Sequence, residues 1–469
     1  MANFKTLSAP LLMACLSIAC SAQAEKAENN YKKYCASCHG GQLQGGLGSS
    51  LVDKQWKYGA SDADIARVIE KGIADKGMPA WEKTLTQDDI RALIIYIREE
   101  GASAKVDAQL KSVQPQGGIF STRHHKFKLE KVIDGFGVLW GLEFLSDGSF
   151  LLSERDGKLW QVKGKQKTEI TGIPKVWAKT QGGLLDIAIK DASSENPWVY
   201  LSYSQPSAKG AMTAIIRGKI KNNQFVDSQI IYQAAEAFHT NKGYHFGSRI
   251  VLNDGYIFFS VGDRGDRQQA QDLSRPNGKI HRLHDDGRMP ADNPFVNTPN
   301  AVKSIWSYGS RNPQGMVMSH DGLLWEAEHG PRGGDEVNII EKGVNYGWPL
   351  ISYGMNYDGT AVTNKTSAPG MAQPKHYWVP SIAVTAIDEY TGSAFARWAN
   401  HLLVGSLARQ EVQLLEVKGG EVISTELLLK NQGRIRDLVV GPEGFIYLAM
   451  NPDNQKGSGV YRLVPVTSM

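Results

Sequence analysis

Cysteine is scarce in this chain of 469 residues, which contains only four. Cys15 and Cys20 fall within an apolar N-terminal stretch, so only Cys35 and Cys38 remain beyond it. Two cysteines placed so close together exclude the disulfide framework of a small secreted domain. Long apolar runs are also missing beyond the N-terminal stretch, where none reaches the roughly 18 residues of a membrane-spanning helix. We therefore expect no transmembrane segment.

A strong excess of one charge sign is absent as well. The formal net charge is +4, from 52 basic and 48 acidic residues. This mild balance gives no support for binding to nucleic acid or to an anionic membrane surface. Glycine, in contrast, is plentiful at 49 residues. Frequent glycine favours many short strands connected by tight turns.

Residues 1–24 have the pattern of a signal peptide. Lys5 is followed by an apolar run from Leu7 to Ala19, and then by the small-x-small cleavage pattern AQA that ends at Ala24. We therefore expect export to the periplasm. The stretch LMAC, which ends at Cys15, resembles a lipoprotein processing site and leaves lipid anchoring as an alternative.

Residues 25–104 are predicted to form a small helical domain. Two helices are expected to begin at Ser61 and Thr86, where an acidic residue three positions later resembles a capping box. Apolar residues then recur at helical spacing, and Gly101 is expected to end the second helix. The following residues 105–122 are expected to be a linker, since the chain around them is rich in Ala, Ser, Gln and Gly.

From residue 123 onward the pattern changes to short strands, and one cue recurs. A tight turn comes before an apolar or aromatic strand at six places, which are DGSFLLS at Asp147, NPWVYLS at Asn196, DGYIFFS at Asp254, DGLLWEA at Asp321, ANHLLVG at Ala399 and EGFIYLA at Glu443. Units of about 40 to 80 residues that repeat as short strands are typical of a β-propeller. We predict an all-β six-bladed β-propeller over residues 123–466. A β-sandwich or barrel with incidental turns is the alternative.

The heptapeptide YCASCHG, Tyr34 to Gly40, holds both cysteines that follow the N-terminal stretch. Cys-x-x-Cys-His is the attachment sequence for c-type haem, in which Cys35 and Cys38 form thioethers and His39 ligates the iron. Half of a zinc site is one alternative, but zinc needs two further ligands and no other cysteine follows. A redox dithiol is another, although the surrounding pattern is helical rather than α/β. We expect haem c.

A second iron ligand is expected from a thioether or an imidazole. Met78 lies in KGMPAW, in a turn-like Gly-Met-Pro before the last predicted helix, and no other Met or His falls between His39 and Trp81. The alternative is a methionine that only fills space. The whole segment resembles class I-type cytochromes c, in which a Gly-Met-Pro turn carries the distal methionine. The resemblance implies His39 and Met78 as the two iron ligands.

Polar motifs stand out within the predicted propeller. His245 lies in GYHFGSR, and EHGPRGGDEVN combines turn-forming residues with acidic groups in a way that suits a hard cation such as Ca²⁺. Arg434 and Arg436 alternate along a strand, so both would project to one side and suit an anion with several carboxylates. Each motif has a simpler interpretation, either a hydrogen-bonded strand histidine or a salt-bridged surface strand. The Arg264-Gly265-Asp266 tripeptide is not taken as an adhesion motif.

Taken together, these segments resemble the soluble aldose (glucose) dehydrogenases that depend on pyrroloquinoline quinone (PQQ), a family of six-bladed propellers. The resemblance is carried by LWGLEFLSDGSFLLSERDGKLW, QGGLLDIAI, YHFGSR, AQDL, GKIHRL, DNPF, IWSYGSRNPQGM, EHGPRGGDEVNIIEKGVNYGWPL and RIRDLVVGPEGFIYL. It implies oxidation of an aldose sugar at C1 to a lactone with PQQ and Ca²⁺. The haem domain would then accept the electrons and pass them to a downstream periplasmic acceptor.

The resemblance also implies a role for each matching residue. His245 would be the general base, and Arg311 would stabilise charge near the quinone. The residues that would bind or line the quinone are Gln181, Asn312, Arg434, Arg436 and Trp378. Gly330 and Pro331 would give carbonyls to the active-site Ca²⁺, and Glu336 and Tyr346 would bind a structural Ca²⁺. One position departs from the family. Some members have a quinone-binding lysine where this chain has Ala408, and the neighbouring Arg409 would point the other way along a strand. Of the properties that the resemblance implies, quinone affinity is therefore the one that Ala408 affects most.

Two other functions are consistent with the residues alone. One is a Ca²⁺-dependent propeller hydrolase or lactonase with a fused electron-transfer domain. The other is a binding propeller without catalytic activity. Dependence of the activity on quinone separates both from a sugar dehydrogenase.

Overall fold

The computed structural model describes residues 25–53, 55–110, 113–452 and 457–466. The predicted signal peptide, residues 1–24, and the alternative lipid-attachment site at Cys15 lie outside the described residues. The described chain forms two compact units. One unit ends at Ala104 and also includes Gly354–Asn364, and the other holds the remaining residues. None of the described helices is both long enough and apolar enough to cross a membrane.

The N-terminal unit is helical, as predicted. Its elements are α1 (Glu25–Tyr34), α2 (Ala36–His39), α3 (Asp62–Lys71), the 3₁₀ turn η1 (Ala74–Lys76) and α4 (Gln87–Leu110). Ser61 caps α3 through a reciprocal capping box with Asp64. The unit packs around the apolar residues Ile65, Ile69, Leu93 and Ile97.

The prediction that Gly101 ends the last helix is wrong, since α4 continues to Leu110. A glycine within a helix costs only about 1 kcal/mol relative to alanine, and the good helix formers that follow can offset this. A Cβ atom at position 101 would lie 3.8 Å from the Cα of Val52, so the backbones approach closely here. Of the stretch 105–122, the first residues therefore belong to α4 and residues 119–121 to strand β1.

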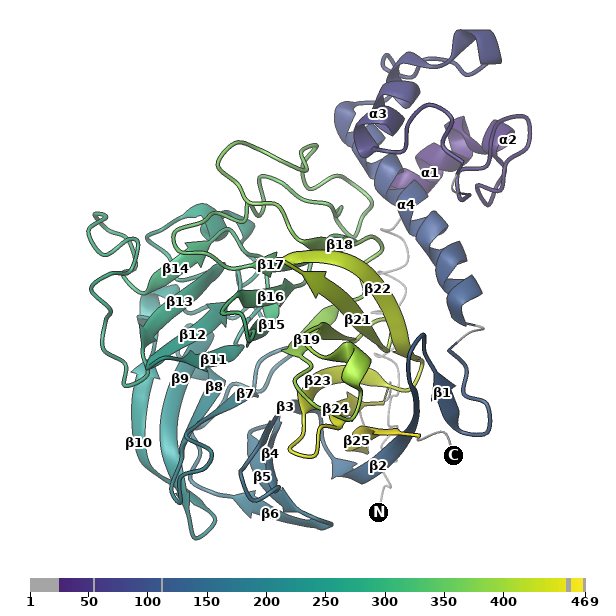
Figure 1. The fold of residues 1–469 in the computed structure, drawn as a ribbon. Helices are drawn as coiled ribbons and strands as arrows, with labels where there is room; N and C mark the ends of the chain where they lie inside the picture. Colours follow the sequence, from purple (N-terminus) through teal and green to yellow (C-terminus); the bar gives the residue numbers. More distant parts are fainter. Residues whose placement is uncertain (1–24, 54, 111–112, 453–456, 467–469) are drawn as a thin grey trace, which may run out of the picture. The chain divides into compact units, whose positions relative to one another are not determined.

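The second unit is a six-bladed β-propeller, as predicted (Figure 1). Blade 1 has β3 (Leu139–Phe144), β4 (Phe150–Glu154), β5 (Lys158–Lys163) and β6 (Gln166–Ile170), and blade 2 has β7 (Leu184–Lys190), β8 (Trp198–Ser207), β9 (Gly210–Lys221) and β10 (Gln224–Tyr232). Blade 3 has β11 (Ile250–Asn253), β12 (Tyr256–Val261), β13 (Lys279–His284) and β14 (Ile305–Tyr308), and blade 4 has β15 (Pro313–Met318), β16 (Leu324–Glu328), β17 (Asp335–Ile339) and β18 (His376–Trp378).

Blade 5 has β19 (Val384–Glu389), β20 (Leu402–Ser406), β21 (Glu411–Lys418) and β22 (Glu421–Lys430). Blade 6 closes the ring, because β23 (Arg434–Val440), β24 (Ile446–Asn451) and β25 (Ser458–Pro465) from the end of the chain pair with β2 (Lys126–Phe136), which in turn pairs with β1 (Ile119–Ser121). Three short 3₁₀ turns, η2 (Glu236–Phe238), η3 (Arg267–Gln271) and η4 (Ala396–Trp398), lie in the connections.

The six sequence cues each mark one blade. Every cue lies between the first and second strands of a blade, for example at Asp147 between β3 and β4 and at Asp254 between β11 and β12. Gly255 has a φ of 77°, a backbone conformation that glycine adopts without strain. The turn residue and the buried strand that follows therefore recur together, and the repeat reports the number of blades.

The apolar core is divided among the interfaces between successive blades. Leu151 of blade 1, for example, packs in one cluster with Val199 and Leu201 of blade 2. Similar clusters join blades 2 and 3, 3 and 4, 4 and 5, 5 and 6, and 6 and 1. The innermost strand of each blade, β3, β7, β11, β15, β19 or β23, neighbours that of the next blade. The polar residues discussed below lie on or beside these innermost strands.

Candidate functional site

A cavity of about 170 Å³ opens at one end of the ring of inner strands. Its walls come from residues at the start of inner strands and at the end of the second strands, which share one end because the strands are antiparallel. The lining residues are Val138, Trp140, Arg155, Gln181, Leu185, Phe246, Gly247, Asn312, Gln314, His329, Leu407, Arg434, Arg436 and Asn451. Among these there are three arginines and no carboxylate.

Both arginines of the RIRD motif lie in the cavity wall. Arg436 donates a hydrogen bond to Gln314, with 3.2 Å between Nη1 and Oε1, but its buried Nε has no partner among the described residues. Burial, and then the positive charges of Arg434 and Arg155, lower the pKa of Arg436 to about 9. A wall of mutually repelling guanidiniums is suited to an anionic ligand.

His245 is held by a carboxylate that the sequence interpretation did not include. Nδ1 of His245 lies 2.6 Å from Oδ1 of Asp263, whose other oxygen accepts a hydrogen bond of 2.9 Å from Nε1 of Trp348. The backbone N–H of His245 donates to Oε1 of Gln181 at 2.7 Å, which connects the histidine to the cavity wall. Asp263 is 1% exposed. The pair therefore has a fixed geometry.

The electrostatics of this pair favour a neutral imidazole. Burial lowers the pKa of His245, and the charge of Arg311 lowers it further, while Asp263 opposes both effects. Burial by itself raises the pKa of Asp263, but the hydrogen bond with His245 and the nearby cations outweigh it and hold that pKa below its usual range. A neutral His245 that donates Nδ1–H to Asp263 keeps Nε2 free to accept a proton.

Arg264 holds the loop that carries His245. Its guanidinium donates to the carbonyl oxygens of Lys242, at 2.8 Å, and of Tyr244, and stacks 3.4 Å above the ring of Phe246. Arg264 is 1% exposed, and burial lowers its pKa to about 9. The tripeptide that begins at Arg264 is therefore buried at its first residue and positions the His245 loop.

Arg311 and Asn312 are anchored by the EHGPRGGDE segment. Their backbone N–H groups both donate to Oε2 of Glu328, and Nη1 of Arg311 donates to the carbonyls of His329 at 3.0 Å and Gly330 at 2.7 Å. Oδ1 of Asn312 accepts from the backbone N–H of Gly247 at 3.1 Å. Asn312 lines the cavity, whereas Arg311 is not among its lining residues.

The turn at Gly330 and Pro331 is closed by Asp335. Oδ1 of Asp335 accepts from the backbone N–H of Gly330 at 2.9 Å, and Oδ2 accepts from that of Ile382 at 2.9 Å. A Cβ atom at position 330 would lie 2.2 Å from the carbonyl oxygen of Gly334, so only glycine fits this turn. The tight turn brings several backbone carbonyls close together. Pro331 is buried within it.

Glu336, which is half-buried, faces buried acidic groups in blade 4. Glu328 lies opposite Glu336 in the β16–β17 register, and Glu326 lies opposite Asn338. Burial, with the charge of Asp263, raises the pKa of Glu328 to about 7, although the backbone N–H groups of Arg311 and Asn312 oppose it. Burial and repulsion by Glu328 raise the pKa values of Glu326 and Glu336 well above the usual value. No set of three or more His, Cys, Asp or Glu side chains in the described part of the chain is arranged to hold a metal ion.

The remaining predicted site residues lie in different surroundings. Tyr346 is buried, and its hydroxyl donates to the carbonyl of Ile339 at 2.5 Å. Trp378 does not line the cavity but packs in the core between blades 4 and 5, and its Nε1 donates to Gln413 at 3.1 Å. Ala408 is exposed, and neither it nor Arg409 lines the cavity.

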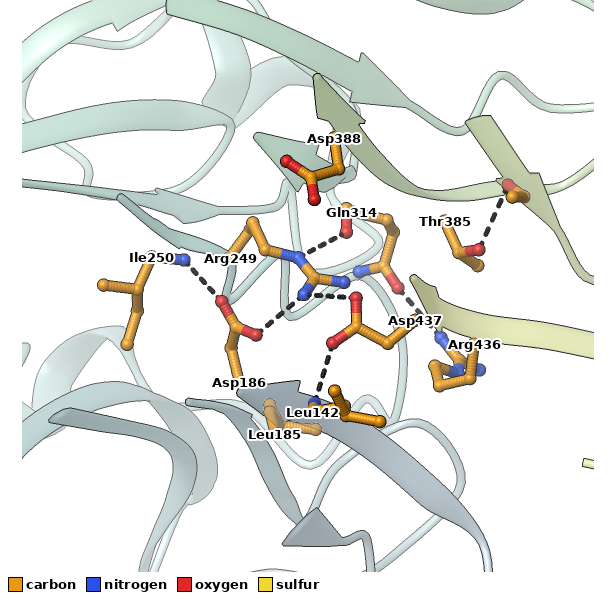
Figure 2. A network of polar contacts seen from close by, with 12 residues as sticks. Leu142, Leu185, Asp186, Arg249, Ile250, Gln314, Thr385, Asp388, Arg436 and Asp437 are labelled. Atoms are coloured by element: carbon orange, nitrogen blue, oxygen red, sulfur yellow. Dashed lines mark hydrogen bonds and ion pairs between the residues drawn. The ribbon is translucent and has the colours of Figure 1, made fainter. Parts of the chain in front are cut away.

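A buried ion cluster lies on the inner strands next to the cavity (Figure 2). Nη1 of Arg249 lies 2.7 Å from Asp186 and 2.9 Å from Asp437, and its Nε donates to the carbonyl of Gln314 at 2.9 Å. Burial raises the pKa of Asp186 to about 7, although Arg249 opposes the effect. The cluster ties blades 2, 3, 4 and 6 together, and Gln314 connects it to Arg436.

Replacing Arg249 with methionine is expected to lower the free energy of unfolding of the propeller by about 3–5 kcal/mol at pH 7, because two buried carboxylates lose their cation. Urea unfolding followed by tryptophan fluorescence measures the change. Lys163→Met is the matched control, since it breaks an exposed pair with Asp147 and is expected to cost only about 0–1 kcal/mol. Equal effects of the two substitutions would show that the cluster does not stabilise the ring.

The N-terminal unit contains a second cavity, of about 120 Å³, with mostly apolar walls. Cys35, His39 and Met78 all line it, together with Ile65, Leu93 and other apolar residues. Nδ1 of His39 lies 2.8 Å from the carbonyl oxygen of Ser49. Metal-ligating histidines usually donate one ring N–H to such an acceptor, which leaves the other nitrogen for the metal. Cys38 is three residues from Cys35, and neither thiol forms a disulfide.

Three residues of the cavity region were missed in the sequence. Asp263 lies 18 residues after His245 and is brought to it only by the loops at the ends of blade 3. Arg155 and His329 line the cavity and stand in segments that carry the family resemblance, ERDG and EHGP, but nothing local marks them as lining residues.

Comparison with known proteins covers both units. The profile of the family described as "Glucose / Sorbosone dehydrogenase" matches residues 136–462, and that of "Cytochrome C oxidase, cbb3-type, subunit III" matches residues 22–97. The N-terminal unit is thus a cytochrome c domain.

Similar individual proteins share the propeller region. The aldose sugar dehydrogenase YliI of Escherichia coli is 39% identical over 320 residues, which is 66% of this chain and 86% of that protein. The quinoprotein glucose dehydrogenase B of Acinetobacter calcoaceticus is 30% identical over 294 residues, 55% of this chain and 60% of that protein. The crystal structure of the soluble aldose sugar dehydrogenase from Escherichia coli in its apo form covers 72% of this chain and 100% of its own, with 35% identity and a TM-score of 0.67.

Proposed function

The chain belongs to the glucose / sorbosone dehydrogenase family, and on this premise we propose that it oxidises an aldose at C1 to the lactone with PQQ and transfers the electrons to haem c in its own N-terminal domain. The observation that carries the proposal is the cavity lined by three arginines and no carboxylate, next to the His245–Asp263 pair. The name of the Acinetobacter relative, a quinoprotein, supports the choice of cofactor.

The cavity residues fit a planar polyanion such as PQQ, which carries three carboxylates. Arg434, Arg436 and Asn312 would hold its oxygens, and the orphaned Nε of Arg436 supplies a donor that the protein leaves unused. Gln181 also lines the cavity and would contact the cofactor at its edge. When bound, PQQ supplies a two-electron acceptor for the hydride that leaves the sugar carbon.

Two Ca²⁺ sites complete the proposal. The carbonyls of Gly330 and Pro331 would face one ion, which needs further oxygen ligands from the cofactor because the described chain offers no acidic side chain in the cavity wall. Arg311 already donates a hydrogen bond to the carbonyl oxygen of Gly330. This oxygen has two lone pairs, so it would contact both the guanidinium and the Ca²⁺ ion. Glu336 and the carbonyl of Tyr346 would hold the second ion, whose charge would relieve the repulsion among Glu326, Glu328 and Glu336.

The residues of the chain divide the chemistry among them. His245, neutral near pH 7, accepts the proton of the C1 hydroxyl on Nε2 as the sugar is oxidised. Asp263 fixes the orientation of the ring and stabilises the imidazolium that forms. Arg311, fixed by two carbonyls, places a positive charge where negative charge develops. The buried Arg264 keeps the His245 loop in place.

The cytochrome domain supplies the electron acceptor. Cys35 and Cys38 would form the thioethers, and His39 and Met78 would ligate the iron of haem c, which accepts one electron at a time. Fusion to the propeller raises the effective concentration of the acceptor at the enzyme. We further propose that residues 1–24 act as a signal peptide for export to the periplasm, where the haem passes its electrons to a downstream acceptor.

The proposal is tested with purified full-length protein, PQQ, Ca²⁺, an artificial dye and a panel of aldoses. We expect dye reduction and lactone formation that require both the quinone and an aldose. Turnover of lactones or esters without quinone would instead identify a hydrolase, and binding without turnover would identify a non-catalytic propeller.

A further inference from the structure

Arg155 brings a third guanidinium into the cavity, from blade 1. It follows the last residue of β4, and its backbone is fixed on both sides. Its N–H donates to the carbonyl of Val138 at 2.8 Å, and its carbonyl accepts from the N–H of Leu184 in blade 2 at 3.2 Å. A Cβ atom at Gly183 would lie 1.8 Å from the carbonyl oxygen and 2.6 Å from Cγ of Arg155. The absence of a side chain at Gly183 therefore lets the backbone of Arg155 pack closely against blade 2.

The guanidinium of Arg155 has no hydrogen-bond acceptor among the described residues. Across the described residues it makes no hydrogen bond, and the acidic group whose charge acts on it is its exposed neighbour Asp156. Burial lowers the pKa of Arg155, and its charge contributes to lowering that of Arg436. The guanidinium of Arg434 likewise has no hydrogen-bond partner among the described residues, so two of the three cavity arginines are unpaired. Three repelling cations so close together favour a ligand with several negative charges.

Blade 5 supplies no cation to the cavity wall. Leu407 is its contribution to the cavity wall, and the next residue, Ala408, is exposed and uncharged. Arg409 lies outside the lining and follows Ala408 with its backbone tied to Ile382. The positive charge of the cavity therefore comes from blades 1 and 6 alone.

We propose that Arg155 is a cofactor-binding residue, which forms with Arg434 and Arg436 a three-guanidinium site for a planar tricarboxylate. The inference rests on the proposed function in that the natural tricarboxylate would be PQQ. Three guanidiniums match three carboxylates in charge, and each can bind a carboxylate in a bidentate manner.

The test measures binding rather than activity, with two probes on the full-length protein. PQQ with Ca²⁺ is followed by quenching of tryptophan fluorescence, and trimesate (benzene-1,3,5-tricarboxylate) by isothermal calorimetry. We expect Arg155→Gln to weaken both by about 10- to 100-fold, in keeping with the loss of one charged hydrogen-bonded pair. Arg409→Gln is the matched control and is expected to leave both affinities unchanged.

A second substitution protects the test against a general folding defect. Arg155→Lys keeps a positive charge at the same place in the cavity wall and is expected to retain at least part of the affinity that Arg155→Gln loses. Unchanged affinity of Arg155→Gln for both probes would overturn the inference and leave the proposed function intact. Arg155-dependent binding of trimesate without any binding of PQQ would overturn the proposed function and keep the tricarboxylate site. Failure of the wild-type protein to bind either probe would overturn both.

Discussion

Replacing His245 with alanine is expected to lower the rate of aldose oxidation by about 10²- to 10⁴-fold, the usual contribution of a general base, while PQQ stays bound. The imidazole is the neutral base next to the cavity, with Nδ1 committed to Asp263 and Nε2 free. Its side chain does not line the cavity wall, so its loss removes the proton acceptor and leaves the arginines in place. Dye-coupled rates and quinone binding by fluorescence quenching, measured on the same samples, separate the two effects.

The matched control is His124→Ala, which removes an exposed histidine before β2 and is expected to leave the rate unchanged. If His245→Ala retained turnover within a few-fold of the wild type, the base assignment would be wrong. If it lost quinone binding in proportion to its rate, His245 would be a binding residue instead.

The pH dependence of the rate follows from the same pair. Only neutral His245 can accept a proton, so the rate falls as the pH drops through its pKa. Burial and Arg311 hold that pKa below its usual value of about 6.5, and the rate should therefore persist to pH values below this. Asp263→Asn removes an interaction that raises the pKa of His245. The fall in rate on the acid side of the pH–rate profile should therefore move to still lower pH. The plateau rate should also drop by about 10²-fold, because the imidazole ring loses its orientation. A shift of this fall in rate to higher pH would contradict the assignment of His245 as the general base.

Replacing Cys35 and Cys38 together with alanine is expected to abolish covalent haem and to leave oxidation with an artificial dye within about two-fold of the wild type. The two units have separate cavities and separate cores, so loss of the haem leaves the propeller site unchanged. The Cα–Cβ stubs cannot form thioethers, and the apolar cavity around His39 and Met78 then lacks its covalent ligand. Haem staining of a denaturing gel, together with dye-coupled rates, measures both outcomes.

Serine at position 37, between the cysteines, provides the matched control, because Ser37→Ala leaves both thiols in place and should keep the haem. Haem retained on the denatured double variant would contradict covalent attachment. Loss of dye-coupled activity from the double variant would contradict the independence of the propeller site.

The sequence was sufficient for the blade count because each blade repeats a local event. A tight turn such as Asp254-Gly255 and the buried strand after it are both set by neighbouring residues, so six turns give six blades. The length of α4 was not predictable in the same way. Gly101 is a common helix stop, but here it packs against Val52, which no local pattern reveals.

The candidate site was less visible because most of its contacts join distant residues. Asp263 is an ordinary turn residue until the fold brings it to His245, and Arg155 becomes a cavity residue only because Gly183 of the next blade lets it lie close. Trp378 illustrates the opposite case. The family resemblance implied that Trp378 lines the quinone, but its register opposite Asp335 places it in the core between blades 4 and 5.

The most direct test of the account is to mix an aldose with the full-length protein, loaded with PQQ and Ca²⁺, in the absence of oxygen and of any dye, and to record the haem α-band. The account predicts that the band grows to full reduction only when aldose, quinone and Ca²⁺ are all present. An aldose oxidised with a dye while the haem stays oxidised would contradict the central claim that one chain both removes the electrons from the sugar and accepts them.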